Sequence, residues 1–163
     1  MSTEHPNARL IHTFYTAFQK RDPEAMVACY HPDIWFSDPV FQELRGPRAG
    51  NMWRMLNERA KTIEITYDGV SADDKTGRAH WEAKYPFTAT GRDVHNIIDA
   101  TFEFRDGKIV RHADSFDLHR WAGMALGMKG KLLGWLPAVQ NKIRAQGMAG
   151  LAAYEAKATA RAV

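Results

Sequence analysis

Asp38, His112 and Asp114 are the residues of this sequence whose types and spacing best fit acid–base chemistry. His112 and Asp114 are two positions apart, so on a β-strand their side chains point to the same face. A carboxylate in an apolar setting can move a proton to or from a bound molecule, and a nearby second carboxylate raises one of the two pKa values. A histidine works in either protonation state near neutral pH. The structural alternatives are that Asp38 and Pro39 make a turn, and that His112 and Asp114 satisfy each other inside the core.

Alternation of apolar and polar residues indicates which side chains share the buried face of the predicted strands. In residues 94–104, Asn96 lies on the apolar face together with Ala100 and Phe102. In residues 108–116, the side chains predicted to point together are Val110, His112, Asp114 and Phe116. Polar groups on a buried face cost free energy unless they are paired. They therefore mark either a binding site or a set of mutually satisfied core residues.

The elements that must position these side chains follow from periodicity and turn residues. Helical spacing predicts helices over residues 7–20, from Asp22 to about His31, and from Gly46 to about Ala60. Alternation predicts strands over residues 34–37, 62–71, 78–88, 94–104 and 108–116. The last four strands are joined by short turns and so form an antiparallel meander. Three helices followed by a meander predict an α+β fold, with the helices packed on the apolar face of a curved sheet.

This order of elements resembles the NTF2-like superfamily, and within it the ketosteroid isomerase and SnoaL-like branch. The segments that carry the resemblance are residues 22–28 (DPEAMVA), residues 35–40 (WFSDPV) and residues 106–109 (DGKI). It covers residues 7–118 and implies a cone-shaped fold around a hydrophobic pocket. The last strand, with DSFDL at residues 114–118, is also similar to that of limonene-epoxide-hydrolase relatives. In those enzymes the first Asp takes part in acid–base activation, a role that falls on Asp114 here.

The resemblance implies that Asp38 is the proton-shuttling base, because it occupies the Asp of the family's Asp-Pro-Val segment. The family's two oxyanion donors do not carry over. Phe14 stands where the first helix should supply a Tyr, with Tyr15 beside it, and Ala100 stands where the third meander strand should supply an acid. Asp99 is one residue early, so alternation turns it to the outer face. Steroid isomerisation as such is therefore not predicted.

The predicted site combines three catalytic residues, Asp38, His112 and Asp114, with a lining of mostly aromatic side chains. The predicted substrate-binding residues are Phe14, Tyr15, Trp35, Trp53, Trp81, Tyr85, Phe87, Asn96 and Phe116. The first hypothesis is a cofactor-independent enzyme without a metal, acting on a small apolar carbonyl- or epoxide-bearing molecule by isomerisation, cyclisation, dehydration or epoxide hydrolysis. The second is a non-catalytic ligand-binding or dimerisation module, because fold does not imply function.

Composition and charge exclude several other classes. The chain has 163 residues, enough for one hydrophobic core, and a single cysteine, Cys29, so it has no internal disulfide and no Cys-cluster zinc site. Nucleotide-binding and nucleophile-elbow motifs are absent. The first residues have no apolar leader, which predicts a cytoplasmic protein. From Leu118 onward there are seven cations and one anion, and a basic charge confined to this segment does not predict nucleic-acid binding.

The predicted NTF2-like domain spans residues 1–118, and residues 119–163 form a helical extension. Glycines recur every three or four residues from Gly123 to Gly134, a spacing that permits close backbone approach. Pro137 opens a second helix that reaches about Lys157. We expect this extension to pack on the sheet or on a second subunit. A lid over the pocket, or contact with a membrane surface, are the alternatives. The resemblance also predicts a homodimer through the exposed sheet face.

Overall fold

The computed structural model describes residues 4–162 and confirms an α+β fold. The helices are α1 (Pro6–Gln19), α2 (Pro23–Val27), α3 (Pro47–Arg59), α4 (Leu118–Leu126), α5 (Met128–Leu133) and α6 (Pro137–Arg161). The strands are β1 (Tyr30–Ser37), β2 (Leu44–Arg45), β3 (Glu64–Ala72), β4 (Thr76–Phe87), β5 (Arg92–Arg105) and β6 (Lys108–Ser115). Within the described residues, no helix combines the length and apolar character that crossing a membrane requires.

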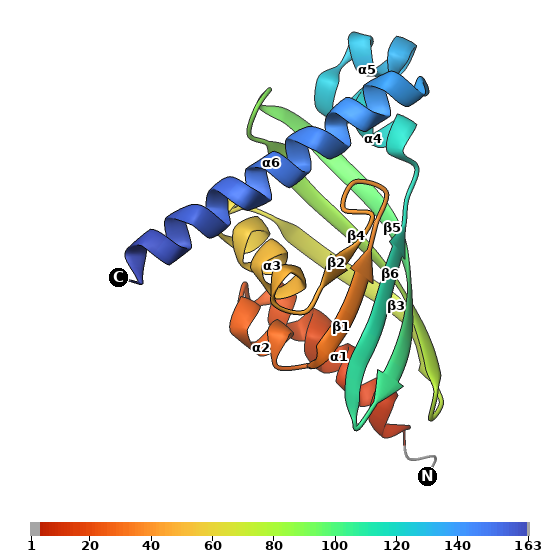
Figure 1. Ribbon diagram of the computed structural model, residues 1–163. Helices are drawn as coiled ribbons and strands as arrows, with labels where there is room; N and C mark the ends of the chain where they lie inside the picture. Colours follow the sequence, from red (N-terminus) through yellow and green to blue (C-terminus); the bar gives the residue numbers. More distant parts are fainter. Residues whose placement is uncertain (1–3, 163) are drawn as a thin grey trace.

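The six strands form one curved sheet in the order β2-β1-β6-β5-β4-β3. Strands β3 to β6 are the predicted antiparallel meander, whereas β1 pairs with β6 in parallel. Helices α1, α2 and α3 lie together on one side of the sheet, and α6 runs across α3 (Figure 1). The main core fills the space between these helices and the sheet, so the inward side chains of the strands become buried.

Two predictions at the start of the sheet are wrong. The second helix ends at Val27 rather than near His31, and β1 begins at Tyr30 although Pro32 lies within it. The pairing of β1 with β6 is irregular between Tyr30 and Trp35, which accommodates the proline. The short strand β2 was not predicted, because two residues carry no alternation signal.

A bulge in β6 changes the predicted inward set at one position. Phe104 pairs with Ile109 and Glu103 with Arg111, so Val110 is the extra residue on β6. Ile109 is consequently fully buried and Val110 only half-buried, which corrects the prediction that Val110 points inward with His112. Beyond the bulge the alternation is regular, and both His112 and Asp114 are buried as predicted.

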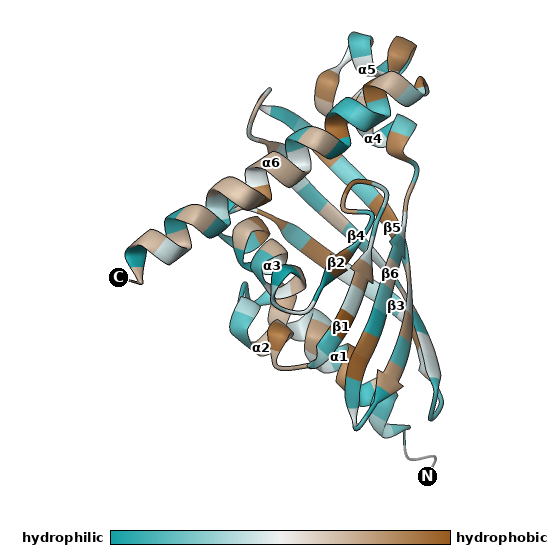
Figure 2. Cartoon of the chain, viewed as in Figure 1, coloured by the Kyte–Doolittle hydropathy of each residue, from teal (hydrophilic) through white to brown (hydrophobic). Residues whose placement is uncertain are grey.

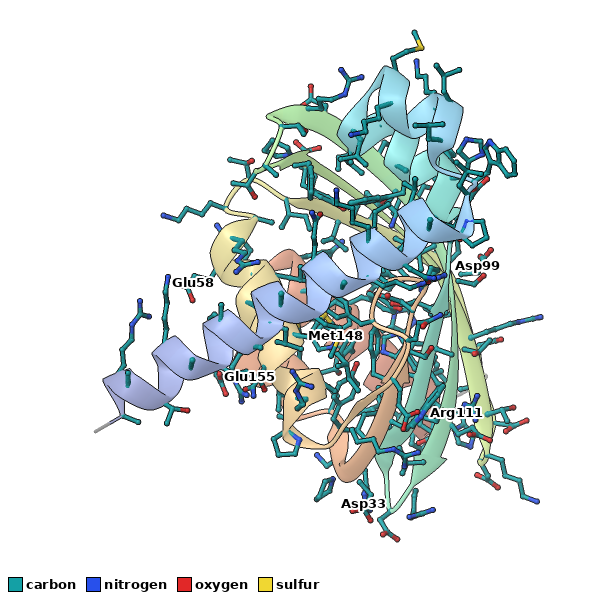
Figure 3. All side chains as sticks on the ribbon, turned by 45° about the horizontal axis from the view of Figure 1, so that its top comes forward. Asp33, Glu58, Asp99, Arg111, Met148 and Glu155 are labelled. Carbon is teal, nitrogen blue, oxygen red and sulfur yellow. The ribbon has the colours of Figure 1, made fainter. Side chains whose placement is uncertain are left out.

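The C-terminal helices pack against the end of the sheet and across the hairpin after β1. A second apolar cluster joins Val94 of β5 to Leu118, Trp121, Ala122 and Ala125 of α4 and Ile143 of α6. Glu155 of α6 accepts hydrogen bonds from Arg48 at 2.8 Å and Asn51 at 2.9 Å, both on α3. Figure 3 shows Met148 and Glu155 on the side of α6 that faces the rest of the molecule. The extension is therefore packed on the body of the chain rather than hanging free.

Replacing Gly130 by alanine is expected to destabilise the α4–α5 corner. A Cβ built on Gly130 would lie 1.9 Å from the carbonyl oxygen of Ala122, so the backbone of one helix would have to move. Overpacking of this kind costs about 1–3 kcal/mol. Thermal unfolding should show a melting temperature several degrees lower. Gly150→Ala on α6 is the matched control, because a Cβ there would meet only the flexible end of the Arg59 side chain, at 3.0 Å. Equal stability of Gly130→Ala and the wild type would contradict the close packing.

Candidate active site

A buried chain of hydrogen bonds links four elements through His112. The hydroxyl oxygen of Tyr30 lies 2.8 Å from His112 Nδ1 and accepts a hydrogen bond from Trp53 Nε1 at 2.8 Å. His112 Nε2 lies 2.9 Å from Asp114 Oδ1, which also accepts from Trp81 Nε1 at 3.2 Å. Strands β1, β4 and β6 and helix α3 are thus connected by polar side chains inside the core.

The hydrogen atoms of this chain are assigned from its donors and acceptors. Because Trp53 donates to the Tyr30 oxygen, the hydroxyl hydrogen of Tyr30 is free to be donated to His112 Nδ1. The remaining ring hydrogen then sits on Nε2 and is donated to Asp114. Every donor points to an acceptor, which is the condition for a stable buried polar network.

The histidine ring is enclosed by aromatic side chains and has no exposed surface. Its centroid lies 4.5 Å from that of Phe102, 5.1 Å from that of Phe36 and 5.5 Å from that of Phe14. Trp53 stacks on it at 6.0 Å. The neighbours of the His112 ring at these distances are aromatic side chains, and its Nε2 lies beside Asp114.

Tyr15 is the one fully buried hydroxyl among residues 4–162 that finds no hydrogen-bond partner. Burial, together with the nearby charge of Asp114, raises the pKa of Tyr15 well above its usual value. The hydroxyl therefore keeps its hydrogen and remains a donor. With Phe14 and Trp53, it belongs to the filled part of the interior.

Asp38 directly follows β1 and closes the turn that leads to β2. Its Oδ1 accepts hydrogen bonds from the backbone N–H groups of Val40 at 2.7 Å and Phe41 at 2.6 Å. Asp38 therefore stabilises the turn that it forms with Pro39, as the structural alternative predicted. Burial raises the pKa of Asp38 to about 7, and the charge of Asp114 adds to this increase, while the two N–H groups oppose it. A carboxyl group with this pKa exchanges protons near neutral pH.

Tyr85 and Asn96 lie on the same inner surface, nearer the end of the sheet that α4 covers. The Tyr85 oxygen accepts a hydrogen bond from Trp121 Nε1 at 2.9 Å. Burial and the charge of Asp38 raise the pKa of Tyr85, so its hydroxyl stays protonated. Asn96 is 7% exposed. The structure therefore brings Asp38, Asp114 and Tyr85 within electrostatic reach, with Asn96 farther along β5.

The remaining predicted lining residues divide into two groups. Phe87 packs edge-on against Trp121 with centroids 5.2 Å apart, and half-buried Phe116 lies between the two apolar clusters. The prediction that Trp35 lines the site is wrong. Phe36 takes the inward position, and the guanidinium carbon of Arg111 sits 4.3 Å above the Trp35 ring on the opposite face.

Asp99 points outward, as strand alternation predicts. It pairs with His80 in a regular stretch of the β4–β5 ladder and lies 2.9 Å from His80 Nδ1. Figure 3 shows Asp99 at the side of the sheet away from α1 and α3. The bulge that would re-aim Asp99 is not on β5, because the irregularity falls at Val110 on β6.

Sequence reasoning missed Tyr30 and Trp121, the hydrogen-bond partners of His112 and Tyr85. Tyr30 shares the parity of the inward residues Ile34 and Phe36, and this signal was hidden by the assignment of Tyr30 to a helix. Nothing in the sequence around Trp121 predicts its bond to Tyr85, because the contact joins residues 36 apart.

Two hollows in the surface lie away from these residues. One, of about 110 Å³, is between α3 and α6, and another, of about 660 Å³, opens beside the turn from β3 to β4. Neither includes Asp38, Asn96, His112 or Asp114. In the described part of the chain, no group of three or more His, Cys, Asp or Glu side chains is arranged to hold a metal ion.

The raised pKa of Asp38 predicts a pH-dependent loss of stability. The folded state holds the proton up to about pH 7, whereas an unfolded Asp releases it near its ordinary value of 3.8. The contribution of Asp38 to the free energy of unfolding is therefore fully present at low pH, and it is lost as the pH rises from about 4 to about 7. Asp38→Asn should match the wild type near pH 4 and exceed it by about 2–4 kcal/mol at pH 8, measured by urea unfolding. A wild type more stable than the variant at pH 8 would contradict the assignment.

Comparison with known proteins identifies the family. The profile of the SnoaL-like domain matches residues 11–112, which is more than half of the chain. The chain therefore belongs to the SnoaL-like family of the NTF2-like fold, as the resemblance predicted. No curated protein sequence matches it.

Solved structures agree on the fold. A protein described as a SnoaL-like polyketide cyclase, from Jannaschia, has a TM-score of 0.65 at 14% identity, over 77% of this chain and 94% of its own. A protein described as a polyketide cyclase, from Xanthomonas campestris, has a TM-score of 0.63 at 21% identity, over 76% of this chain and 99% of its own. An epoxide hydrolase of the LEH-like type from Mycobacterium tuberculosis has a TM-score of 0.62 at 21% identity, over 81% and 96%. At these identities the likeness establishes the NTF2-like fold alone.

Proposed function

We propose that this protein is a cofactor-independent acid–base enzyme acting on a small apolar molecule that carries a carbonyl or epoxide group. The observation that carries the proposal is that half-buried Asp38 lies near enough to buried Asp114 for the charge of Asp114 to act on it, in a setting that raises the pKa of Asp38 to about 7. Cyclases and an epoxide hydrolase among the structural neighbours support the same kind of chemistry.

Asp38 is the proton-transferring group in this proposal. Its Oδ1 is held by two backbone N–H groups, and Oδ2 has no donor among residues 4–162. For a ketone, Oδ2 accepts a proton from the carbon next to the carbonyl, and the electron pair moves onto the carbonyl oxygen. Return of the same proton to another carbon of the enolate completes an isomerisation. In a cyclisation, the enolate carbon instead bonds to a second carbonyl carbon of the same substrate, and the proton goes to the alkoxide oxygen that forms. For an epoxide, the protonated carboxyl donates to the ring oxygen as the C–O bond breaks, while a solvent water bonds to that carbon and releases its own proton to a carboxylate or to solvent.

The neighbouring residues complete the proposed site. Tyr85 remains protonated, so its hydroxyl supplies a hydrogen-bond donor for an oxygen of the substrate. Asn96 supplies an amide on the inner face of the sheet. His112 is a positioning residue that holds Asp114 through its Nε2 hydrogen. Trp121 and α4 cover this end of the sheet.

Proton exchange tests the proposal without knowledge of the natural substrate. The protein is incubated with a panel of cyclic ketones and enones in D₂O, and exchange at the carbon next to the carbonyl is followed by NMR. Opening of apolar epoxides is followed in parallel by incorporation of labelled water oxygen. Catalysed exchange or opening that is lost in Asp38→Asn supports the proposal. Rates equal to those of buffer across the whole panel would argue against it.

The filled interior around His112 favours a second candidate, a non-catalytic binding or dimerisation module. His112, Phe14 and Trp53 are buried by side chains, and neither hollow described above reaches the carboxyl pair. A module of this kind would bind an apolar ligand, detected as a rise in melting temperature, without catalysing exchange. Ligand binding with unchanged exchange rates would select this candidate.

We also propose that the protein is a cytoplasmic homodimer associating through the outer face of the sheet. That face carries Ile97, which is 41% exposed, beside the polar side chains of His80, Glu82, His95 and Asp99. Light scattering at micromolar concentration should give twice the mass of the chain. The mass of one chain would contradict the dimer.

A further inference from the structure

The corner formed by α5 and the turn after it exposes large apolar side chains to solvent. Met128 is 67% exposed, Leu132 64%, Trp135 60% and Leu133 40%. Met128 and Leu132 are one helical turn apart and share a side of α5. The indole Nε1 of Trp135 donates to the carbonyl oxygen of Leu132 at 3.1 Å, which holds the ring beside them. Brown, apolar segments mark α5 at the end of the molecule opposite the N-terminus (Figure 2). We call these four residues the apolar corner.

The chain around the apolar corner carries positive charge only. Residues 118–154 contain no Asp or Glu, and their cations are Arg120, Lys129, Lys131, Lys142 and Arg144. Lys129 and Lys131 are exposed and alternate with the apolar residues of α5. An apolar surface bordered only by cations is complementary to a surface that is apolar inside and anionic outside.

The corner is also firmly built, although its helix is short. Gly130 packs directly on Ala122 of α4, and His119 Nε2 lies 2.8 Å from the carbonyl oxygen of Lys131. The exposed side chains are therefore presented by a fixed backbone, and docking does not require the helix to fold first.

We propose that the apolar corner, with Lys129 and Lys131, docks this protein on a membrane surface that contains anionic lipid. The side chains of Met128 and Leu132 enter the boundary between headgroups and acyl chains, where the ring of Trp135 also prefers to lie. The two lysines contact lipid phosphate and carboxylate groups. The helix lies on the surface rather than crossing it. The docked corner belongs to the same α4–α5 unit that covers Tyr85, so the membrane faces the covered end of the sheet.

A second copy of the chain fits this surface less well. A symmetric interface would place the same patch on both subunits and bring the cations of one against those of the other. Four side chains at these exposures present on the order of 400 Å², about half of the roughly 800 Å² per partner of a stable protein interface. Insertion into lipid needs no such matching area.

Vesicle binding tests the proposal independently of any catalytic activity. The full chain is mixed with phosphatidylcholine vesicles with or without about 30 mol% phosphatidylserine and sedimented at roughly 50 mM and 500 mM salt. We expect binding that requires phosphatidylserine and is weakened at high salt. Trp135 emission should shift to shorter wavelength on binding. Trp53, Trp81 and Trp121 are already buried, and the shift should disappear in Trp135→Phe.

Two pairs of substitutions separate the contributions of apolar and cationic side chains to vesicle binding. Leu132→Gln with Trp135→Gln, and Lys129→Gln with Lys131→Gln, should each lower the vesicle partition coefficient at least tenfold. The matched control is Lys75→Gln in the β3–β4 turn, which is exposed and is expected to bind as the wild type does. Absence of binding, equal binding to both vesicle types, or unaltered binding of the corner variants would overturn the proposal. So would a fall in the mass of the lipid-free protein on corner substitution, which would assign the corner to a second copy.

Discussion

Asp38→Asn is expected to lower turnover about 100-fold or more on any substrate found by proton exchange. The substitution keeps an oxygen that can accept from the N–H groups of Val40 and Phe41, so the turn is preserved. It removes the group that gains and loses the proton, a contribution typically worth 10²–10⁴-fold. In the wild type, turnover that uses Asp38 as a base should rise with pH through about 7 and level off above it, because only the ionised form accepts a proton.

Two further variants place this result in context. Asp114→Asn should lower turnover at least tenfold, since it removes the charge that acts on Asp38, while its amide oxygen can still accept from His112 and Trp81. Asp99→Asn is the matched control. It changes an exposed carboxylate on the neighbouring strand that points away from the site and lies 2.9 Å from half-buried His80 Nδ1, so turnover should stay within about twofold. If Asp99→Asn proves as damaging as Asp38→Asn, the site lies on the other face of the sheet and our assignment is wrong.

His112→Leu is expected to destabilise the fold by about 3–5 kcal/mol. It leaves the Tyr30 hydroxyl and the Asp114 carboxylate without the partner that each has in the buried network. A chain of this length loses about 2–4 °C per kcal/mol, so the melting temperature should fall by about 10 °C or more. Urea unfolding monitored by fluorescence and by circular dichroism gives the free energy.

A double-variant cycle separates the network from simple loss of packing. Adding Tyr30→Phe to His112→Leu removes one of the stranded polar groups, so the double variant should be more stable than the sum of the two single losses predicts. If the two single losses of unfolding free energy simply add in the double variant, Tyr30 and His112 do not stabilise the fold through their hydrogen bond. A loss below about 1 kcal/mol for His112→Leu would show that the network does not stabilise the fold.

The sequence by itself determined the order of elements and the faces of the meander. The burial of apolar side chains decides which face of a long strand points inward. Because successive residues of a strand alternate between its faces, the sequence pattern alone reveals this choice. It correctly placed Asn96, His112 and Asp114 inside and Asp99 outside. Turning Phe102 outward to bring Asp99 in would have exposed a ring that is now 2% exposed. The resemblance carried by residues 22–28 and 35–40 supplied the family, which the match to residues 11–112 confirmed.

Only the tertiary structure decided what surrounds those inward residues. Tyr30 was assigned to a helix because Pro32 follows closely, yet parallel pairing of β1 with β6 outweighs that local signal and delivers the hydroxyl to His112. The bulge at Val110 and the bond from Trp121 to Tyr85 join residues far apart in the chain, for which spacing carries no information. Burial and the charge of Asp114 set the pKa of Asp38, and neither exists until strands β1 and β6 lie side by side. Charges and apolar patches act through space, so their effect on one residue is fixed only when the whole chain has folded.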